Sequence, residues 1–218
     1  MNEELDLGKY QDKKLIAFDL YWTCVDHHLN FTKISWELRD ILKTNPITLQ
    51  DIQEWKIEKD WRKFELDNEF IENIRKDIEW TFLFPETLEA LKYIKSKWYQ
   101  TAVVSNLSKD YAEPLYRLIP EWLFDYKILS FEVWATKSDS DSRIYEQLKT
   151  ESWIDFKDMI MIWDSLKADV IWSNNVGITP IHLNRDEEWT DEKWIKEVEK
   201  LWIKFIQIST LADLMKFL

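Results

Sequence analysis

Acidic, hydroxyl and cationic side chains follow short apolar runs at four points of the chain. They are Asp19 after residues 15–18, Ser105 after 101–104, Lys137 beyond 127–130, and the pair Asp164 and Asp169 after 159–162. If these runs are parallel strands, their carboxyl ends meet at one edge of a sheet, where α/β folds build active sites. A lone aspartate after a strand is commonly a turn or cap residue. The interpretation therefore depends on all four points together.

These residue types suit transfer of a phosphoryl or ester group. A carboxylate such as Asp19 can act as a nucleophile and form a covalent intermediate. Ser105 can donate a hydrogen bond to a transferring phosphoryl group, and Lys137 can neutralise its charge. Asp164 in the turn and Asp169 about one helical turn later can offer carboxylates to one divalent ion, because Mg²⁺ prefers oxygen ligands.

The elements that must position these residues alternate between strands and helices. Continuous apolar runs are typical of strands buried on both faces. Strands are predicted over residues 15–18, 101–104, 127–130, 159–162 and 178–183, and helices over 85–97, 108–118, 142–149 and 166–173. The tail, residues 206–218, predicts a short strand and a closing helix capped by Ser209 or Thr210. This order predicts an α/β fold with a Rossmann-like, largely parallel sheet flanked by helices.

Residues 26–80 differ in character from the rest of the chain. Apolar residues recur there at helical spacing, for example Ile34, Leu38 and Ile41. The pattern predicts three or four helices, interrupted near Asn45 and Pro46.

The composition restricts the function classes. A net charge of −12 and a pI near 4.8 argue against binding to nucleic acid, which needs basic patches. No apolar run approaches the roughly 20 residues of a membrane helix, and the charged first residues do not resemble a secretory signal. The single cysteine, Cys24, predicts a small buried residue and a reducing, cytoplasmic setting.

Tryptophan and glycine occur in unusual numbers. The chain has 14 Trp and only 2 Gly, whereas glycine at its usual 7% would give about 15. Several tryptophans stand where a tight turn or helix end favours glycine: positions 22, 98, 134, 163 and 172. Some bacteria read UGA as glycine, and translation with another code would print tryptophan instead. We therefore predict that many of these tryptophans are glycines in the native protein.

Four segments together resemble the haloacid dehalogenase (HAD) superfamily of hydrolases. DLYWTCVD (19–26) resembles the first family motif, Asp-x-x-Gly-Thr, and VVSN (103–106) resembles the second. VWATK (133–137) resembles the stretch that ends in the third-motif lysine, and IWDSLKAD (162–169) resembles the fourth motif. Reading tryptophan as glycine sharpens every match that contains a tryptophan. The resemblance covers nearly the whole chain.

The resemblance implies a role for each matching residue. Asp19 would attack phosphorus and form a covalent intermediate, while Lys137 would balance the charge. Thr23 and Ser105 would hold phosphoryl oxygens, with Asn106 beside them, and Tyr21 and Asn106 would bind the substrate. Mg²⁺ would be bound by Asp19, the Tyr21 carbonyl, Asp164 and Asp169. Residues 26–84 would form a small all-helical cap domain that governs specificity, over a core domain of residues 1–25 and 85–218. The implied activity is a Mg²⁺-dependent phosphatase acting on a small phosphorylated metabolite, with no nucleic-acid or membrane partner; oligomeric state stays open.

Two departures keep alternatives open. Tyr21 stands where phosphatases of this kind carry a second aspartate as general acid, and a tyrosine there resembles the 2-haloacid dehalogenase branch, which works without a metal. Asp164 and Asp169 oppose that reading, because they resemble a metal site. The segment SDSDSR (138–143) is longer than the usual family segment after the lysine. A non-catalytic member that binds a ligand is the third alternative.

Overall fold

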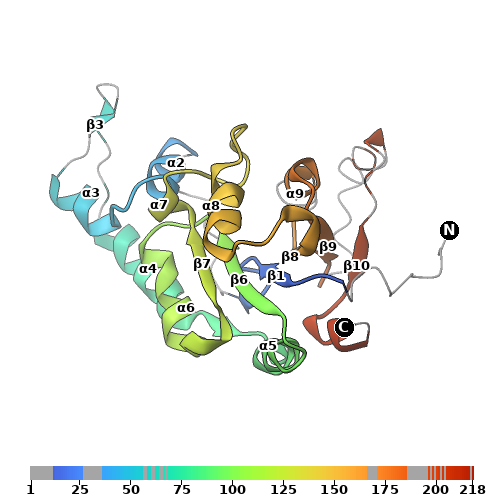
Figure 1. The fold of residues 1–218 in the computed structure, drawn as a ribbon. Helices are drawn as coiled ribbons and strands as arrows, with labels where there is room; N and C mark the ends of the chain where they lie inside the picture. Colours follow the sequence, from blue (N-terminus) through green and yellow to red (C-terminus); the bar gives the residue numbers. More distant parts are fainter. Residues whose placement is uncertain are drawn as a thin grey trace.

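The computed structural model describes residues 12–26, 36–55, 58–59, 62–63, 66, 68–165, 171–185, 196, 198, 200–201, 203, 205–216 and 218. Its centre is a six-stranded sheet in the order β10-β9-β8-β1-β6-β7 (Figure 1). The strands are β1 (Leu15–Phe18), β6 (Gln100–Ser105), β7 (Tyr126–Leu129), β8 (Met159–Trp163), β9 (Thr179–Leu183) and β10 (Ile206–Ile208). All five pairings between them are parallel. The expected α/β fold with a parallel sheet is confirmed.

The two faces of the sheet carry separate hydrophobic clusters. Alternate residues of β1 divide between them, so that Ile16 and Phe18 face one cluster while Leu15 and Ala17 face the other. Helices α5 (Thr87–Ser96) and α6 (Glu113–Leu118) and the 3₁₀ segment η5 (Leu211–Lys216) contribute to the first cluster. Helices α8 (Arg143–Ser152) and α9 (Ile171–Val176) contribute to the second. Burial on both faces explains why the central strands are continuous apolar runs.

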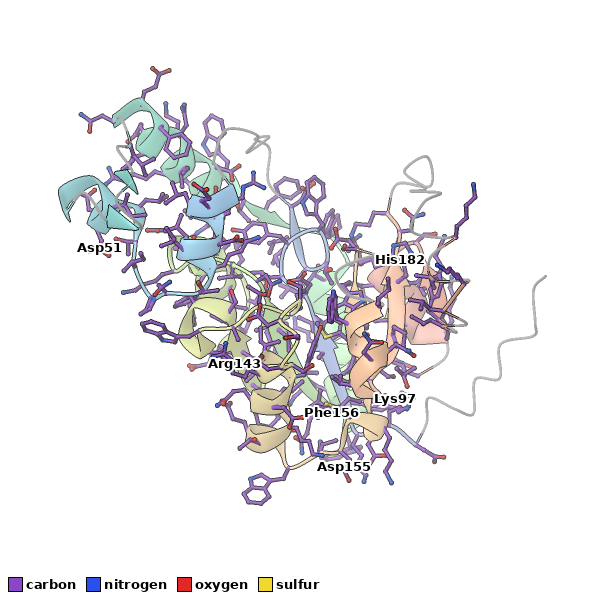
Figure 2. The ribbon with its side chains drawn as sticks, turned by 90° about the horizontal axis from the view of Figure 1, so that it is seen from above. Asp51, Lys97, Arg143, Asp155, Phe156 and His182 are labelled. Atoms are coloured by element: carbon purple, nitrogen blue, oxygen red, sulfur yellow. The ribbon has the colours of Figure 1, made fainter. Side chains whose placement is uncertain are left out.

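The segment between the first strand and α5 has a hydrophobic cluster of its own. It contains helices α2 (Trp36–Lys43), α3 (Leu49–Trp55) and α4 (Asn68–Trp80). Buried side chains from all three helices pack together, including Leu38, Ile52 and Ile74. Seen from above, Asp51 of α3 and His182 of β9 lie on opposite sides of the molecule (Figure 2). We call residues 36–80 the helical segment; its status as a cap domain with bounds 26–84 stays a prediction.

Several elements differ from the expected ones. The helical segment also contains a hairpin, β3 (Glu58–Lys59) with β4 (Arg62–Lys63), so it is not all-helical. A short helix that was not predicted, α7 (Ser130–Val133), follows β7. The helix predicted over 108–118 begins as the 3₁₀ turn η1 (Asp110–Ala112) before α6. At the start of the closing turn η5, the Asp213 carboxylate accepts hydrogen bonds from the backbone N–H groups of Ser209 and Thr210. Residues 166–170, including the first part of the helix predicted over 166–173, lie outside the described residues.

Tryptophans occupy left-handed backbone positions. Within the described residues, five non-glycine residues have positive φ, and four of them are tryptophans: Trp22 (60°), Trp98 (68°), Trp134 (59°) and Trp153 (58°). Left-handed conformations of this kind favour glycine, because a Cβ atom crowds the following carbonyl. Trp98 and Trp153 are 93% and 92% exposed, so packing does not explain why a large side chain stands there. Trp163 and Trp172 were also expected to replace glycine, but neither is among the positive-φ residues.

No helix among the described residues combines the length and apolar character needed to cross a bilayer.

Candidate active site

The first-motif loop follows β1 and turns sharply at the carboxyl edge of the sheet. The Asp19 N–H donates to the Ile162 carbonyl at 3.0 Å, which continues the β1–β8 pairing by one residue. The backbone N–H groups of Cys24 and Val25 both donate to the Leu20 carbonyl, at 2.8 and 3.0 Å, and so close the turn. The turn places the Asp19 carboxylate at the strand end, with its side chain 15% exposed.

Two of the expected site residues converge on Asp19. The Ser105 hydroxyl, at the end of neighbouring β6, donates to Asp19 Oδ1 at 2.5 Å. Lys137 Nζ donates to Asp19 Oδ2 at 2.6 Å, although the two residues are 118 positions apart in sequence. The Lys137 side chain is only 2% exposed, so this ion pair is largely removed from water. A buried charge needs its partner, which makes the carboxylate and the ammonium group mutually dependent.

The loops after β6 and β7 hold Lys137 in place. Asn106 Oδ1 accepts a hydrogen bond from the Lys137 backbone N–H at 2.8 Å. Ser130 Oγ accepts from the Leu107 N–H at 3.0 Å and lies 3.1 Å from the Leu107 carbonyl, to which it donates. The long segment after Lys137 therefore does not displace its ammonium group from Asp19. Asn106, expected to bind substrate, here uses its side-chain oxygen to orient the lysine.

Thr23 is fully buried in the first-motif turn. Among the described residues, its hydroxyl oxygen finds no hydrogen-bond partner. A buried hydroxyl without a partner costs about 1–3 kcal/mol. A ligand oxygen at this loop would remove that cost, which fits the expected role of Thr23.

Asp164 follows β8, the strand that pairs with β1 on the side away from β6. Phe18 and Ile162 are register partners, so Asp19 and Asp164 leave neighbouring strands at nearly the same level. The Asp164 carbonyl accepts a hydrogen bond from His182 Nε2 at 2.9 Å, and burial lowers the pKa of His182, which favours its neutral form. Asp169 lies outside the described residues.

The donor set can be tested for a metal. Within the described residues, no group of three or more His, Cys, Asp or Glu side chains is close enough to hold an ion. Two carboxylates and the Tyr21 carbonyl are nevertheless hard oxygen donors of the kind that Mg²⁺ prefers, and Mg²⁺ commonly keeps several waters. The donor chemistry of Asp19 and Asp164 therefore fits a magnesium ion with a partly hydrated shell.

Tyr21 points to a different part of the molecule. Its hydroxyl donates to the Tyr111 carbonyl at 3.2 Å, and the two rings pack edge to face with centroids 5.7 Å apart. The Tyr111 hydroxyl in turn donates to Asp77 Oδ2 at 3.3 Å, where Asp77 is a fully buried residue of α4. Burial raises the pKa of both tyrosines. We call Tyr21, Tyr111 and Asp77 the hinge network, because they join the first-motif loop to the helical segment.

Arg185, which follows β9, was not expected in the site. Its guanidinium donates to the Thr23 carbonyl at 2.7 Å and the Trp22 carbonyl at 3.2 Å. It also pairs with Glu86 at 2.6 Å and lies 3.5 Å from the centroid of the Phe84 ring. Burial would raise the pKa of Glu86, but the hydrogen bond and charge of Arg185, together with backbone hydrogen bonds from Glu86 itself and Leu211, lower it overall. Arg185 thus holds the first-motif turn against the start of α5.

Lys43 is a second residue that the sequence analysis missed. It ends α2 of the helical segment, and burial, followed by the nearby charge of Arg39, lowers its pKa. The charges of Asp19, Asp40 and Lys137 also act on its pKa. Cys24, as expected, is buried, and burial raises its pKa, which makes it a poor nucleophile.

Comparisons with known proteins agree on the architecture. No family model and no curated protein matches the sequence. Among solved structures, a HAD phosphatase from Thermococcus onnurineus is similar with a TM-score of 0.61 and 19% identity, covering 93% of this chain and 96% of that one. The fold is that of the HAD superfamily.

Both branches of the HAD superfamily considered above occur among the similar structures. A HAD-family enzyme from Bacteroides thetaiotaomicron, in complex with magnesium and inorganic phosphate, has a TM-score of 0.60 and 18% identity over 82% of this chain and 98% of that one. A 2-haloacid dehalogenase from Pseudomonas syringae has a TM-score of 0.61 and 17% identity over 94% and 97% of the two chains. The choice between phosphorus and carbon chemistry therefore rests on the residues of the site.

Proposed function

We propose that the protein is a Mg²⁺-dependent HAD-type hydrolase that removes a phosphoryl group from a small metabolite through a covalent intermediate on Asp19. The observation that carries the proposal is the Asp19 carboxylate held between the Ser105 hydroxyl, at 2.5 Å, and the Lys137 ammonium group, at 2.6 Å. An oriented, partly buried carboxylate is a competent nucleophile, and its two neighbours remain to stabilise charge on the transferring group.

The residues would act in a simple order. An Asp19 oxygen attacks phosphorus, the bond to the leaving group breaks, and the chain holds the phosphoryl group as an acyl phosphate. Ser105 and the buried Thr23 hydroxyl would donate to phosphoryl oxygens, and Lys137 would shield their charge. Attack by water then releases phosphate and restores the Asp19 carboxylate.

Charge balance favours a metal. A phosphoryl group carries about −1.5 to −2 charge, and the attacking carboxylate adds another negative charge. Lys137 supplies a single positive charge at Asp19. Bound Mg²⁺ would supply the remaining positive charge; Asp19, Asp164, Asp169 and the Tyr21 carbonyl are the residues proposed to hold it.

Phosphate release tests the proposal. Purified protein is given a panel of phosphoesters and acetyl phosphate, with Mg²⁺ or with EDTA, and Asp19→Asn serves as the control. We expect release that needs Mg²⁺ and is lost in Asp19→Asn. Release that survives in EDTA, or in the Asp19→Asn protein, contradicts the proposal.

Tyr21 favours a second candidate, a 2-haloacid dehalogenase in which Asp19 attacks carbon and displaces halide. A haloacid carries one negative charge, which Lys137 alone can balance. Chloride release from 2-chloropropionate in the presence of EDTA, lost in Asp19→Asn, would support this candidate. The absence of both chloride and phosphate release would support the non-catalytic alternative.

We further propose that Trp22, Trp98, Trp134 and Trp153 are glycines in the native protein. Their left-handed backbone, with φ between 58° and 68°, supports glycine at each. The codons at these positions test the idea directly, since UGG rather than UGA at all four excludes it. Independently, Trp98→Gly should raise the free energy of unfolding by about 1 kcal/mol. Trp122→Gly, at an exposed position without positive φ, should not raise it.

A further inference from the structure

The carboxyl end of β8 is held from both neighbouring strands. On the β1 side, the Asp19 N–H donates to the Ile162 carbonyl at 3.0 Å. On the β9 side, the register of the β8–β9 pair ends at Trp163 and His182, so Asp164 lies one residue beyond it. There the His182 side chain supplies the next hydrogen bond, since its Nε2 atom lies 2.9 Å from the Asp164 carbonyl oxygen. The chain therefore leaves β8 with a hydrogen bond on each side.

The hydrogen bond from His182 has a fixed direction. A carbonyl oxygen only accepts, so Nε2 carries the proton and donates it, whatever the charge of the ring. The residue is 4% exposed, and a polar ring buried to this degree needs a partner. The Phe205 ring lies edge-on to the imidazole with centroids 6.0 Å apart, and Gln207 of β10 is its register partner. The imidazole is thus packed against the β10 side of the sheet while its N–H reaches Asp164.

This contact restrains the backbone at a candidate metal ligand. The residue before Asp164 is fixed in the β8–β9 pair, and the carbonyl of Asp164 itself is fixed by His182. Since the peptide groups are planar, both backbone dihedrals of Asp164 are restricted, and with them the direction in which its carboxylate leaves the chain. Without the histidine, an ion that needs this carboxylate would have to order the backbone as it binds, at a cost in conformational entropy.

We propose that His182 is a positioning residue for a divalent cation, and that its Nε2–H orders the Asp164 backbone and so the carboxylate that would share one ion with Asp19. The proposal rests on the Mg²⁺-dependent function proposed above. Mg²⁺ demands near-ideal octahedral geometry, so it is sensitive to the placement of each ligand. Residues that orient metal ligands from behind change metal affinity or activity by about 10- to 100-fold when they are removed.

The position of His182 makes this effect separable from substrate specificity. His182 of β9 and Asp51 of the helical segment lie on opposite sides of the molecule (Figure 2). A variant at His182 should therefore change the Mg²⁺ requirement with little change in the KM of a phosphoester. At saturating Mg²⁺ its kcat should return toward that of the wild type.

Binding of Mn²⁺ tests the proposal without any substrate. Mn²⁺ suits the same carboxylate, carbonyl and water ligands as Mg²⁺, and electron paramagnetic resonance counts the free ion as it is titrated into the full chain. We expect one site on the wild-type protein that is lost in Asp164→Asn. His182→Phe keeps an aromatic ring but removes the donor, so it should raise the Kd of Mn²⁺ by about 10- to 100-fold.

Two further variants distinguish positioning from folding. His182→Gln carries an amide N–H that can reach the place of Nε2, so it should bind Mn²⁺ nearly as tightly as the wild type. Ile181→Val weakens the packing of the neighbouring, fully buried residue of β9 and keeps the histidine, so its Kd should be unchanged. Thermal unfolding without metal verifies that each variant is folded at the temperature of the titration.

The outcomes separate this inference from the proposed function. His182→Phe protein that binds Mn²⁺ as tightly as the wild type overturns the positioning role and leaves the phosphohydrolase proposal standing. His182→Gln or Ile181→Val protein that binds as weakly as His182→Phe does the same, because the loss would then be structural. Wild-type protein that binds no Mn²⁺, or binding that persists in Asp164→Asn, also overturns this inference. Phosphate release that is absent, or that survives in EDTA, overturns the proposed function whatever the titration shows.

Discussion

Around Asp19 the hydrogen bonds converge on one carboxylate, whereas around Tyr21 they lead away from the loop toward the helical segment. Ser105 and Lys137 both donate to Asp19 from elements distant in sequence. Tyr21 donates to Tyr111, and Tyr111 donates to Asp77. The two regions are separated by a single residue along the chain. The difference indicates that the first region is organised for transfer of a charged group, while the second is organised for attachment of the helical segment.

Removal of the nucleophile should have the largest effect. Asp19→Asn keeps the size of the side chain but removes its negative charge, so turnover should fall by about 10⁴- to 10⁶-fold, as for other enzymes that lose their nucleophile. Steady-state kinetics with acetyl phosphate measures it, and circular dichroism verifies folding. Activity within 10-fold of wild type would contradict the assignment of Asp19.

Removal of the buried cation comes next. Lys137→Met preserves the aliphatic stem but leaves Asp19 without its ion pair, so kcat/KM should fall by about 10²- to 10³-fold. Lys149→Met, which removes a lysine paired with the exposed Asp155, is the matched control and should stay within about 2-fold of wild type. Equal effects of the two variants would mean that the convergence on Asp19 has no catalytic role.

Arg185 links the loop itself to the rest of the fold. Arg185→Met removes hydrogen bonds to two loop carbonyls and the pair with Glu86, so the free energy of unfolding should decrease by about 2–3 kcal/mol. Urea denaturation measures this loss. Arg143→Met breaks an exposed pair with Asp141 and should cost less than about 0.5 kcal/mol. A similar small cost for both arginines would refute the role given to Arg185.

A change in the hinge network should affect stability more than rate. Tyr111→Phe leaves the buried Asp77 without the hydroxyl that donates to it, so unfolding should become easier by about 1–3 kcal/mol. Turnover of acetyl phosphate should stay within about 3-fold. Tyr116→Phe, at a residue that is 56% exposed, is the control and should change neither quantity. A large loss of rate in Tyr111→Phe would place the hinge network in the chemistry.

Lys43 should give the smallest effect, visible as a dependence on pH. Burial lowers the pKa of Lys43, so the unfolded chain binds the proton more tightly than the folded protein does. Protonated Lys43 therefore opposes folding at neutral pH, and this cost disappears as the pH rises toward the ordinary lysine pKa of about 10.4. Lys43→Met should be more stable than wild type at pH 7, and the difference should narrow toward pH 10. A destabilised variant at pH 7 would show that the charge stabilises the fold. Lys92→Met, at an exposed position of α5, controls for the loss of a lysine.

The sequence predicted strands most reliably where every residue of the strand is buried. Leu15–Phe18 and Met159–Trp163 are buried along their whole length, so their apolar runs marked the strands and placed Asp19 and Asp164 at their ends. The 3₁₀ start of α6 and the β3–β4 hairpin were not predicted, because their short segments carry too few residues for a periodic pattern.

The rest of the site depends on contacts between residues far apart in the chain. Arg185 resembles any charged loop residue until the fold brings it to Thr23, 162 positions away. Tyr111 and Asp77 belong to different helical elements, and nothing in the sequence of either element indicates that their side chains meet. Asn106 was expected to bind substrate because it follows Ser105, but hydrogen-bond partners such as the Lys137 N–H cannot be read from spacing.

The reactivity of the Cys24 thiol can report how often the first-motif turn opens. Its thiol is the only one in the chain and is fully buried inside the first-motif turn. The carbonyl of the same residue accepts hydrogen bonds from the Phe84 N–H at 3.2 Å and the Thr87 hydroxyl at 2.8 Å. A thiol reagent can reach the sulfur only while this turn is open, so the rate of labelling counts opening events. Labelling rates measured with and without acetyl phosphate would then show whether the turn opens less often while Asp19 carries a phosphoryl group.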